Sequence, residues 1–194
     1  MNKKDMILVE AKRLFGQYGY LGFTLKQLAQ ACDMTAPALY YFYTSKASLF
    51  QDCLLSELDA RHALIRGCIT QSTDFADFAR QFPYDAIDIC ETHSFRVGAA
   101  MVEIIHLPEE TQKELVDAYE QLLISPIETF LDQTLPTPIP HVSHRLVANL
   151  LINLATFISR QSQCYSREES LALFQVLAQG LINASQQAET PQGS

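Results

Sequence analysis

The sequence predicts an all-α protein with a small three-helix N-terminal domain and a larger helical C-terminal domain. Apolar residues recur at helical spacing along most of the 194 residues. Glycine and proline are scarce within these periodic segments, and no hairpin signal such as Asn-Gly interrupts them. Hydrophobic residues make up 48% of the chain, which is enough for a sizeable core. No run of about 18 apolar residues occurs, so no membrane-spanning helix is predicted.

Charge and cysteine usage narrow the class of protein. The net charge is −8, yet residues 1–50 hold six lysines and arginines against three acids. This distribution suggests that only the N-terminal part approaches a phosphate-bearing partner. The five cysteines are odd in number and form no CxxC pair, which favours buried thiols in a reducing cytosol over disulfides or a zinc site. The amphipathic N-terminus carries Asp5 and Glu10 and is not typical of a secretory signal, so we expect a cytoplasmic protein.

The first two helices have clear local start and stop signals. The first is expected over residues 4–18, ending at Gly19. The second begins after Thr24, which can act as N-cap with Gln27 three residues later, the spacing of a capping box. One apolar face then follows at helical spacing, formed by Leu25, Leu28 and Ala29.

A tight turn and a third helix follow directly. The turn is predicted at residues 32–34, where Asp33 tolerates a left-handed backbone. Thr35 can cap the third helix, and Pro37 lies in its first turn, where a missing N–H costs nothing. Leu39 is expected to pack inward. The outer face is then left to Ala36, Pro37, Ala38, Tyr40 and Tyr41.

The remaining helices are longer. Ser45 can cap a helix that runs from Lys46 to the low 70s. A segment from Asp74 is expected to break or kink at Pro83. Further helices are predicted over 94–106, over 108–135 with a kink at Pro126, over 141–163 after a stiff proline-rich connector (136–140), and over 167–187.

A helix, a sharp turn and a second short helix form the helix-turn-helix unit, whose second helix enters the major groove of DNA. The stretch closely resembles the DNA-binding domain of the TetR family of transcriptional regulators over about residues 4–52. It departs from the common pattern at Asp33, Phe42 and Tyr43, where a Gly, a His and a Phe are usual. The matching residues are Phe23-Thr24, Leu28-Ala29, Thr35-x-x-Ala38-Leu39-Tyr40-x-x-Tyr43, Ser45-Lys46 and Leu49-Phe50.

The resemblance implies a set of DNA contacts. Thr24 offers a hydroxyl and free N–H groups to a phosphate, Lys46 is placed to face another, and the Tyr40 hydroxyl can reach the backbone. Because few of the candidate residues have polar side chains that can hydrogen-bond to bases, much of the sequence specificity is expected to come from the shape of the DNA groove. The candidates for base edges are Lys26, Thr35, Ala36, Pro37, Ala38 and Tyr41.

The predicted domains are residues 1–48 for DNA binding, 49–188 for ligand binding and dimerisation, and a disordered tail at 189–194. The last two helices have wide apolar surfaces, which must be covered on more than one side. A second copy of the chain is the natural cover, as the family implies, although both faces can also be covered within one chain. The two DNA-binding domains of such a dimer, related by a two-fold axis, would bind a palindromic operator in double-stranded DNA. The expected dimer residues are Leu150, Leu154, Phe174, Leu177 and Leu181.

By resemblance, the C-terminal domain binds a small-molecule effector that releases the protein, a repressor, from its operator. Asn149 and Asn153 lie on one side of an apolar helix and can face either a ligand or the dimer seam. The candidates for an apolar pocket, each of which also fits an ordinary core, are Phe95, Met101, Tyr119, Leu123, Phe130, Asn153 and Phe157.

Two other classes of function are weighed against this one. Glu103-x-x-His106 has the spacing of di-iron carboxylate bundles, but no second Glu-x-x-His occurs, so no metal or other cofactor is predicted. No catalytic motif stands out, and the chain is not expected to be an enzyme. A DNA-binding protein without an inducer, acting architecturally, is the remaining alternative.

Overall fold

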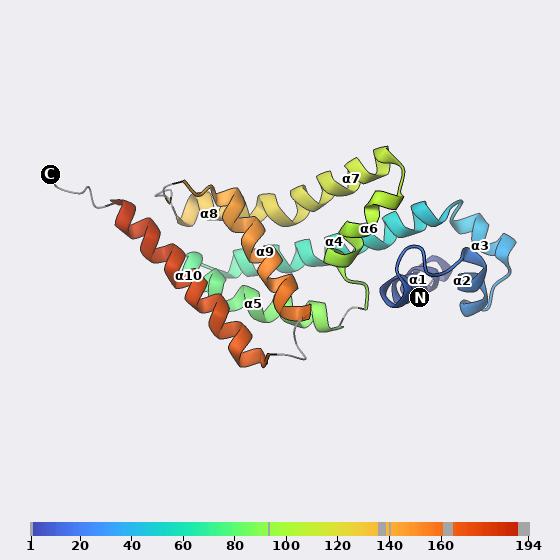
Figure 1. Cartoon of the computed structure of the whole chain (residues 1–194), viewed down its shortest axis with the longest axis horizontal. Coiled ribbons are helices and arrows are strands. Elements are labelled where there is room, and N and C mark those ends of the chain that lie inside the picture. Colours follow the sequence, from blue (N-terminus) through green and yellow to red (C-terminus); the bar gives the residue numbers. More distant parts are fainter. Residues whose placement is uncertain (1, 93, 136–138, 140, 161–164, 190–194) are drawn as a thin grey trace. The chain divides into compact units, whose positions relative to one another are not determined.

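The computed structural model describes residues 2–92, 94–135, 139, 141–160 and 165–189, and its ordered elements in these ranges are all helical (Figure 1). The all-α prediction is therefore confirmed. The elements are α1 (Lys3–Tyr18), α2 (Leu25–Ala31), α3 (Ala36–Phe42), α4 (Lys46–Gln71), α5 (Phe75–Thr92), α6 (Val97–Glu103), the 3₁₀ turn η1 (Ile104–His106), α7 (Glu109–Tyr119), the π-helical turn η2 (Glu120–Ile124), α8 (Ser125–Thr134), α9 (His144–Arg160) and α10 (Arg167–Glu189). None of the described helices is long and apolar enough to cross a membrane.

The chain divides into two compact units. The first contains residues 1–60 and 93–119, and the second contains residues 61–92 and 120–194. Helix α4 contributes to both. Of the predicted proline-rich connector only Ile139 is described, and the predicted tail lies outside the described residues apart from Glu189, the last residue of α10.

The first unit is built around aromatic rings on α1 and α4. The Phe15 ring lies 4.8 Å from Phe23, 4.9 Å from Phe50 and 6.2 Å from Phe95, all edge-on. Helix α1 packs on α2, and α2 packs on α3. An ion pair of 2.9 Å between Lys12 and Glu57, whose side chain is only 2% exposed, also joins α1 to α4. These contacts hold helices α1, α2 and α3 together and connect them to α4.

The core of the second unit gathers along α5, which packs against α8, α9 and α10. The Phe82 ring lies 4.9 Å from Phe78 and 5.9 Å from Phe174. Helix α5 runs through Pro83, so the predicted break does not occur there. Because α5 is buried against three helices, packing outweighs the hydrogen bond that proline removes.

At Pro126 the structure instead changes its helical form. The five π-helical residues of η2 come directly before α8, and Pro126 lies in the first turn of α8. Proline has no N–H to donate to the carbonyl four residues earlier, which is that of Leu122. The Nδ1 atom of His62 on α4 lies 2.7 Å from that oxygen and supplies a donor. A side chain distant in sequence thus stabilises the irregular turn.

Candidate nucleic-acid interface

Local capping fixes helices α2 and α3 at the places that the sequence predicts. The Thr24 hydroxyl accepts a hydrogen bond from the Gln27 N–H at 3.3 Å, and the Gln27 side chain accepts one from the Thr24 N–H at 2.8 Å. Thr35 caps α3 by accepting from the Ala38 N–H at 3.4 Å. Asp33 has a φ of 52°, which turns the chain between the two helices. The predicted capping box, cap and left-handed turn are confirmed.

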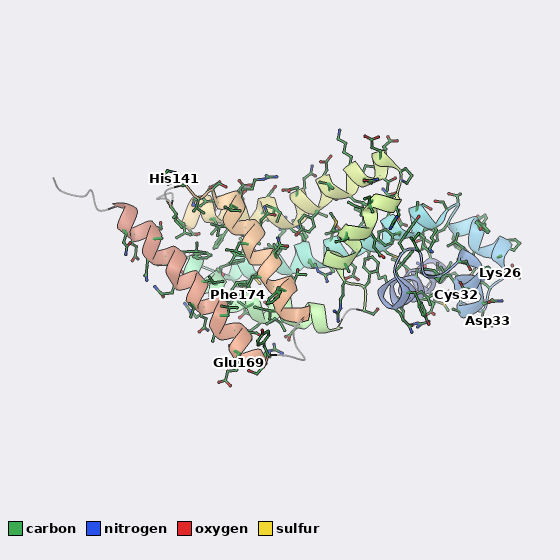
Figure 2. The ribbon with its side chains drawn as sticks, viewed as in Figure 1. Lys26, Cys32, Asp33, His141, Glu169 and Phe174 are labelled. Atoms are coloured by element: carbon green, nitrogen blue, oxygen red, sulfur yellow. The ribbon has the colours of Figure 1, made fainter. Side chains whose placement is uncertain are left out.

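Helix α3 buries one residue and exposes the opposite face. Leu39 is fully buried, whereas Tyr41 is 87% exposed and Tyr40 is 51% exposed. Thr35 and Pro37 are exposed as well, and Ala36 and Ala38 are half-buried. Figure 2 labels Lys26 in the first turn of α2 and Cys32 and Asp33 in the turn after that helix. The residues of this segment predicted to read base edges are therefore exposed or half-buried, and the base contacts themselves stay a prediction.

Lys46, predicted to face a phosphate, has partners inside the protein. Its ammonium donates a hydrogen bond to the Phe23 carbonyl and lies 4.3 Å from the centre of the Phe23 ring and 5.2 Å from that of Tyr20. Burial lowers the pKa of Lys46 from its usual value. These contacts anchor the turn between α1 and α2, and a phosphate contact by Lys46 stays a prediction.

Most of the positive charge in the first fifty residues is neutralised or held internally. Among the described residues only Lys3 and Lys26 of this set have no partner, so these two are the lysines available to phosphates. Lys3 was not singled out from the sequence, because pairing between distant residues decides which cations are available. The paired side chains are Lys4 with Asp52, Lys12 with Glu57, Arg13 with Glu10, and Lys46 with the Phe23 carbonyl.

The C-terminal end of α3 is held by a small polar cluster that sequence reasoning missed. The Tyr43 hydroxyl donates to Asp52 Oδ2 at 3.1 Å, and the Lys4 ammonium lies 3.1 Å from the same oxygen. Burial, together with the nearby Asp52 carboxylate, raises the pKa of Tyr43, which keeps the phenol protonated as a donor. Helix α3 is thereby connected to both α1 and α4.

Glu103 and His106, weighed above as metal ligands, both contact the turn between α1 and α2. Glu103 Oε1 accepts a hydrogen bond from the Tyr20 N–H at 3.0 Å, and the His106 ring stacks on the Tyr20 ring at 6.1 Å. At Gly19, with a φ of 72°, an added Cβ would lie 2.5 Å from the same Glu103 oxygen. No group of three or more metal-ligating side chains occurs among the described residues.

The seven predicted ligand residues are split between the two units. Phe95, Met101 and Tyr119 belong to the first, and the other four belong to the second. Phe95 is buried against Phe15 and Phe50 and forms part of the core beneath the DNA-binding helices. Leu123 and Phe130 are also buried, while Asn153 and Phe157 are exposed. Three of the seven residues therefore lie in the first unit and four in the second, and a ligand contact by any of them stays a prediction.

The predicted dimer residues differ in exposure. Phe174 is fully buried, with its ring against Phe82, so it has no surface to offer to a partner. Leu150 is 45% exposed, and Leu154, Leu177 and Leu181 are partly exposed. The side-chain amides of Asn149 and Asn153 donate to the carbonyls of Arg145 and Asn149, at 3.0 and 2.8 Å.

The N-terminal helices and the chain as a whole are similar to known proteins. Residues 7–53 match the family model described as bacterial regulatory proteins, tetR family. The chain is 27% identical over 134 residues to a Staphylococcus aureus protein, the biofilm operon icaADBC HTH-type negative transcriptional regulator IcaR, covering 68% of this chain and 70% of the relative.

Solved structures show the same fold over nearly the whole chain. A bacterial regulatory protein of the TetR family from a Rhodococcus strain has a TM-score of 0.78 at 21% identity, with 94% of this chain and 97% of that chain covered. AibR, in complex with isovaleryl coenzyme A and operator DNA, has a TM-score of 0.70 at 19% identity, with 91% and 97% covered. The capped, exposed helix pair and these similarities lead to one assignment: residues 7–53 form a DNA-binding domain of the TetR family of bacterial regulatory proteins, and the chain has the fold of TetR-family transcriptional regulators.

Proposed function

We propose that this protein is a homodimeric repressor that binds a palindromic operator and is released from it by a small-molecule ligand. The observation that carries the proposal is the exposed outer face of α3, with Tyr40, Tyr41 and Pro37 accessible and Leu39 buried beneath them. Thr24, in its capping box, presents the N-terminus of α2, and Lys26 lies in the first turn of that helix without a partner among the described residues. Each protomer therefore offers the N-terminus of α2 and the Lys26 ammonium to DNA phosphates, and the short helix α3 to the edges of the bases.

The proposed dimer interface follows an apolar stripe on α9. Leu146, Leu150 and Phe157 are 58%, 45% and 50% exposed, and their spacing of four and seven residues places them on one face of the helix. Asn153 is exposed on the same face, which favours the dimer seam over a ligand pocket for its amide. On α10 the exposed apolar residues are Leu173 and Val176, at 43% and 69%.

Exposed apolar stripes on two long helices are typical of a surface that a partner covers. Leu154, Leu177 and Leu181 are partly exposed and keep their place in the proposed seam. Phe174 is left out, since its ring belongs to the core of the protomer.

The relatives support repression and ligand control. IcaR is described as a negative regulator, and AibR was crystallised with both operator DNA and a coenzyme A thioester. For this chain the effector stays unnamed. A ligand can release the protein only by binding the DNA-incompetent shape more tightly than the DNA-bound shape.

Selection of bound duplexes from a random DNA pool tests the proposal. We expect an enriched palindrome, bound by two protomers, and binding that is lost when Tyr40 and Tyr41 are both changed to Ala. Enrichment of no sequence at low salt, or of a site without two-fold symmetry, would contradict it. A small molecule that both raises the melting temperature and dissociates the selected complex would then identify the effector.

The dimer is tested separately by Leu150→Glu, which places a charge in the middle of the proposed seam. We expect this variant to sediment as a monomer and to lose operator binding. Val116→Glu is the matched control, because Val116 is 42% exposed but lies on α7. A Leu150→Glu protein that stays dimeric would remove α9 from the interface.

A further inference from the structure

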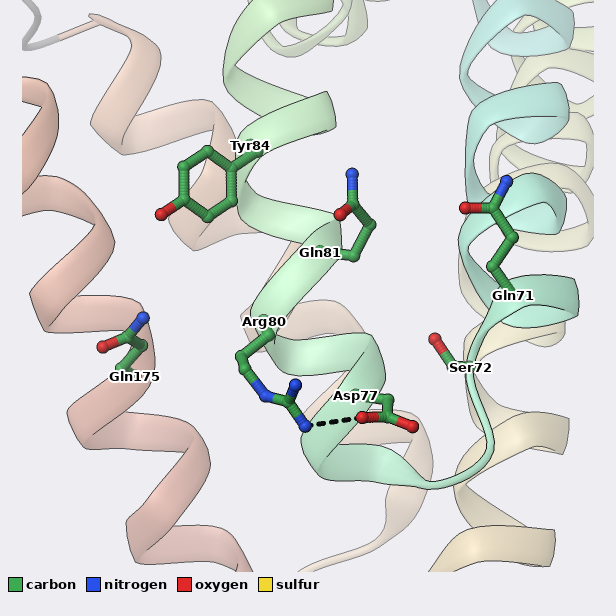
Figure 3. Close-up of a pocket in the computed structure, with 7 residues that line it drawn as sticks. All are labelled: Gln71, Ser72, Asp77, Arg80, Gln81, Tyr84 and Gln175. Carbon is green, nitrogen blue, oxygen red and sulfur yellow. Dashed lines mark hydrogen bonds and ion pairs between the residues drawn. The ribbon is translucent and has the colours of Figure 1, made fainter.

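The second unit has an open, polar pocket that is separate from the apolar ligand residues predicted above. It has a volume of about 490 Å³, within the range of small-molecule sites. Figure 3 shows its seven lining residues, which come from the end of α4, the loop after it, the first ten residues of α5, and α10. They are Gln71, Ser72, Asp77, Arg80, Gln81, Tyr84 and Gln175.

Several polar groups around this pocket have no hydrogen-bond partner in the part of the chain that the structure describes. Among the described residues, the side-chain amides of Gln71 and Gln175 and the hydroxyl of Tyr84 make no hydrogen bond. Gln81 uses its amide nitrogen on both oxygens of Asp85, each at 3.0 Å, which leaves its own oxygen as an acceptor. An amide both donates and accepts, as a hydroxyl group does, so these side chains match a ligand that carries several hydroxyls.

The one arginine that lines the pocket is paired with a carboxylate, and a second carboxylate lies close by. Arg80 pairs with Asp77 at 2.5 Å (Figure 3), and Asp77 also accepts hydrogen bonds from the hydroxyl and N–H of Thr73, which lower its pKa and keep it ionised. Asp85 lies one turn further along α5 and is hydrogen-bonded to Gln81. An incoming phosphate or carboxylate would therefore meet no free cation and two nearby carboxylates, so the electrostatics disfavour anions.

One aromatic ring lies at the edge of the pocket. Tyr84 is 40% exposed, and the Arg167 guanidinium lies 5.9 Å from its ring centre while pairing with Asp88 at 2.6 Å. A ring held in this way offers an apolar surface beside the amides. The C–H face of a sugar ring can pack on such a surface while its hydroxyls bond to the neighbouring side chains.

We propose that this pocket binds a small, neutral, polyhydroxylated molecule of the size of a monosaccharide. Gln71, Gln81 and Gln175 would bond its hydroxyls, and Tyr84 would contact its apolar face. The site is open to solvent, and a ligand must displace water from its polar groups, so a Kd in the millimolar range is expected for a single sugar unit. The proposal concerns binding alone and holds whether or not the bound molecule affects the operator complex.

The test follows the side-chain amide signals of the full-length protein by NMR during titration with three neutral probes: glucose, N-acetylglucosamine and sorbitol. We expect at least one probe at tens of millimolar to shift the amides of Gln71, Gln81 and Gln175 together. Glucose 6-phosphate, which has the same ring with a dianionic group, is expected to bind at least about tenfold more weakly than glucose, because of the acidic surroundings.

Two variants locate the binding. Gln81→Leu is expected to weaken the affinity about tenfold or more, since one hydroxyl partner is lost and the apolar side chain cannot replace it. Gln186→Leu, an exposed position on α10 outside the pocket, is the control and should leave the affinity unchanged. The proposal is overturned if no neutral probe shifts the three amides, if the phosphorylated sugar binds more tightly, or if Gln81→Leu binds like the control.

Discussion

Gly19→Ala tests whether Glu103 holds the turn between α1 and α2. Gly19 combines a φ of 72° with a ψ of 178°, a backbone region that is almost exclusive to glycine and costs other residues about 1–3 kcal/mol. The added Cβ would also lie 2.5 Å from Glu103 Oε1. Because that oxygen ends a flexible side chain, it can move away, and what is then lost is its hydrogen bond to the Tyr20 N–H.

The size of the effect follows from these two parts. A hydrogen bond to a charged group contributes about 1.5–3 kcal/mol. Gly19→Ala should therefore lower the free energy of unfolding by about 2.5–6 kcal/mol when both parts are lost. In a Glu103→Ala background only the backbone part remains, so the same substitution should cost about 1.5–3 kcal/mol less.

Urea unfolding followed by circular dichroism measures all four proteins of this cycle. Gly67→Ala is the matched control, because a Cβ there meets no atom within 4 Å and Gly67 lies inside α4. That control should stabilise the protein by up to about 1 kcal/mol through helix propensity. If Gly19→Ala costs the same in both backgrounds, to within about 0.5 kcal/mol, Glu103 does not hold the turn.

Three further substitutions probe the DNA-binding helices and the irregular turn η2. Lys26→Ala should lower the slope of log affinity against log salt by about one, measured with the selected operator. Lys46→Ala should instead leave this slope unchanged and lower the free energy of unfolding, because the Lys46 ammonium contacts the Phe23 carbonyl. A decrease of the slope by about one would establish the phosphate contact expected from the sequence. His62→Ala should destabilise the protein by about 1–2 kcal/mol, because the Leu122 carbonyl loses its donor. This loss of stability should be smaller in a Pro126→Ala background, because alanine restores an N–H near the Leu122 carbonyl. An equal loss in both backgrounds would show that His62 does not compensate for the N–H that Pro126 lacks.

The sequence predicts the first fifty residues in most detail because their signals are local. The capping box at Thr24, the cap at Thr35 and the left-handed Asp33 each depend on residues within three positions. The contact of Lys46 with the Phe23 carbonyl and that of Glu103 with the Tyr20 N–H join residues 23 and 83 positions apart. Pairings of that kind depend on how helices pack, which periodicity alone does not specify.

Packing also explains where local rules fail in the second unit. Pro83 is predicted to break or kink its helix, but α5 is buried against three others and does not break there. Phe174 has the spacing of an interface residue, yet its ring fills a gap beside Phe82 within the same chain. An apolar stripe on a helix shows that the stripe will be covered, but it does not distinguish an intramolecular cover from a second molecule.

The internal pairing of cations near α1 to α3 bears on how this protein searches a genome. Attraction to arbitrary DNA comes mainly from displacing counterions, and each unpaired cation contributes to it separately. With Lys4, Lys12 and Arg13 bonded to carboxylates, the described residues of these helices leave Lys3 and Lys26 for that purpose. Dwell times on random sequence should accordingly be short at physiological salt. The affinity for the operator would then depend mainly on how closely the DNA groove fits Pro37, Tyr40 and Tyr41 of α3.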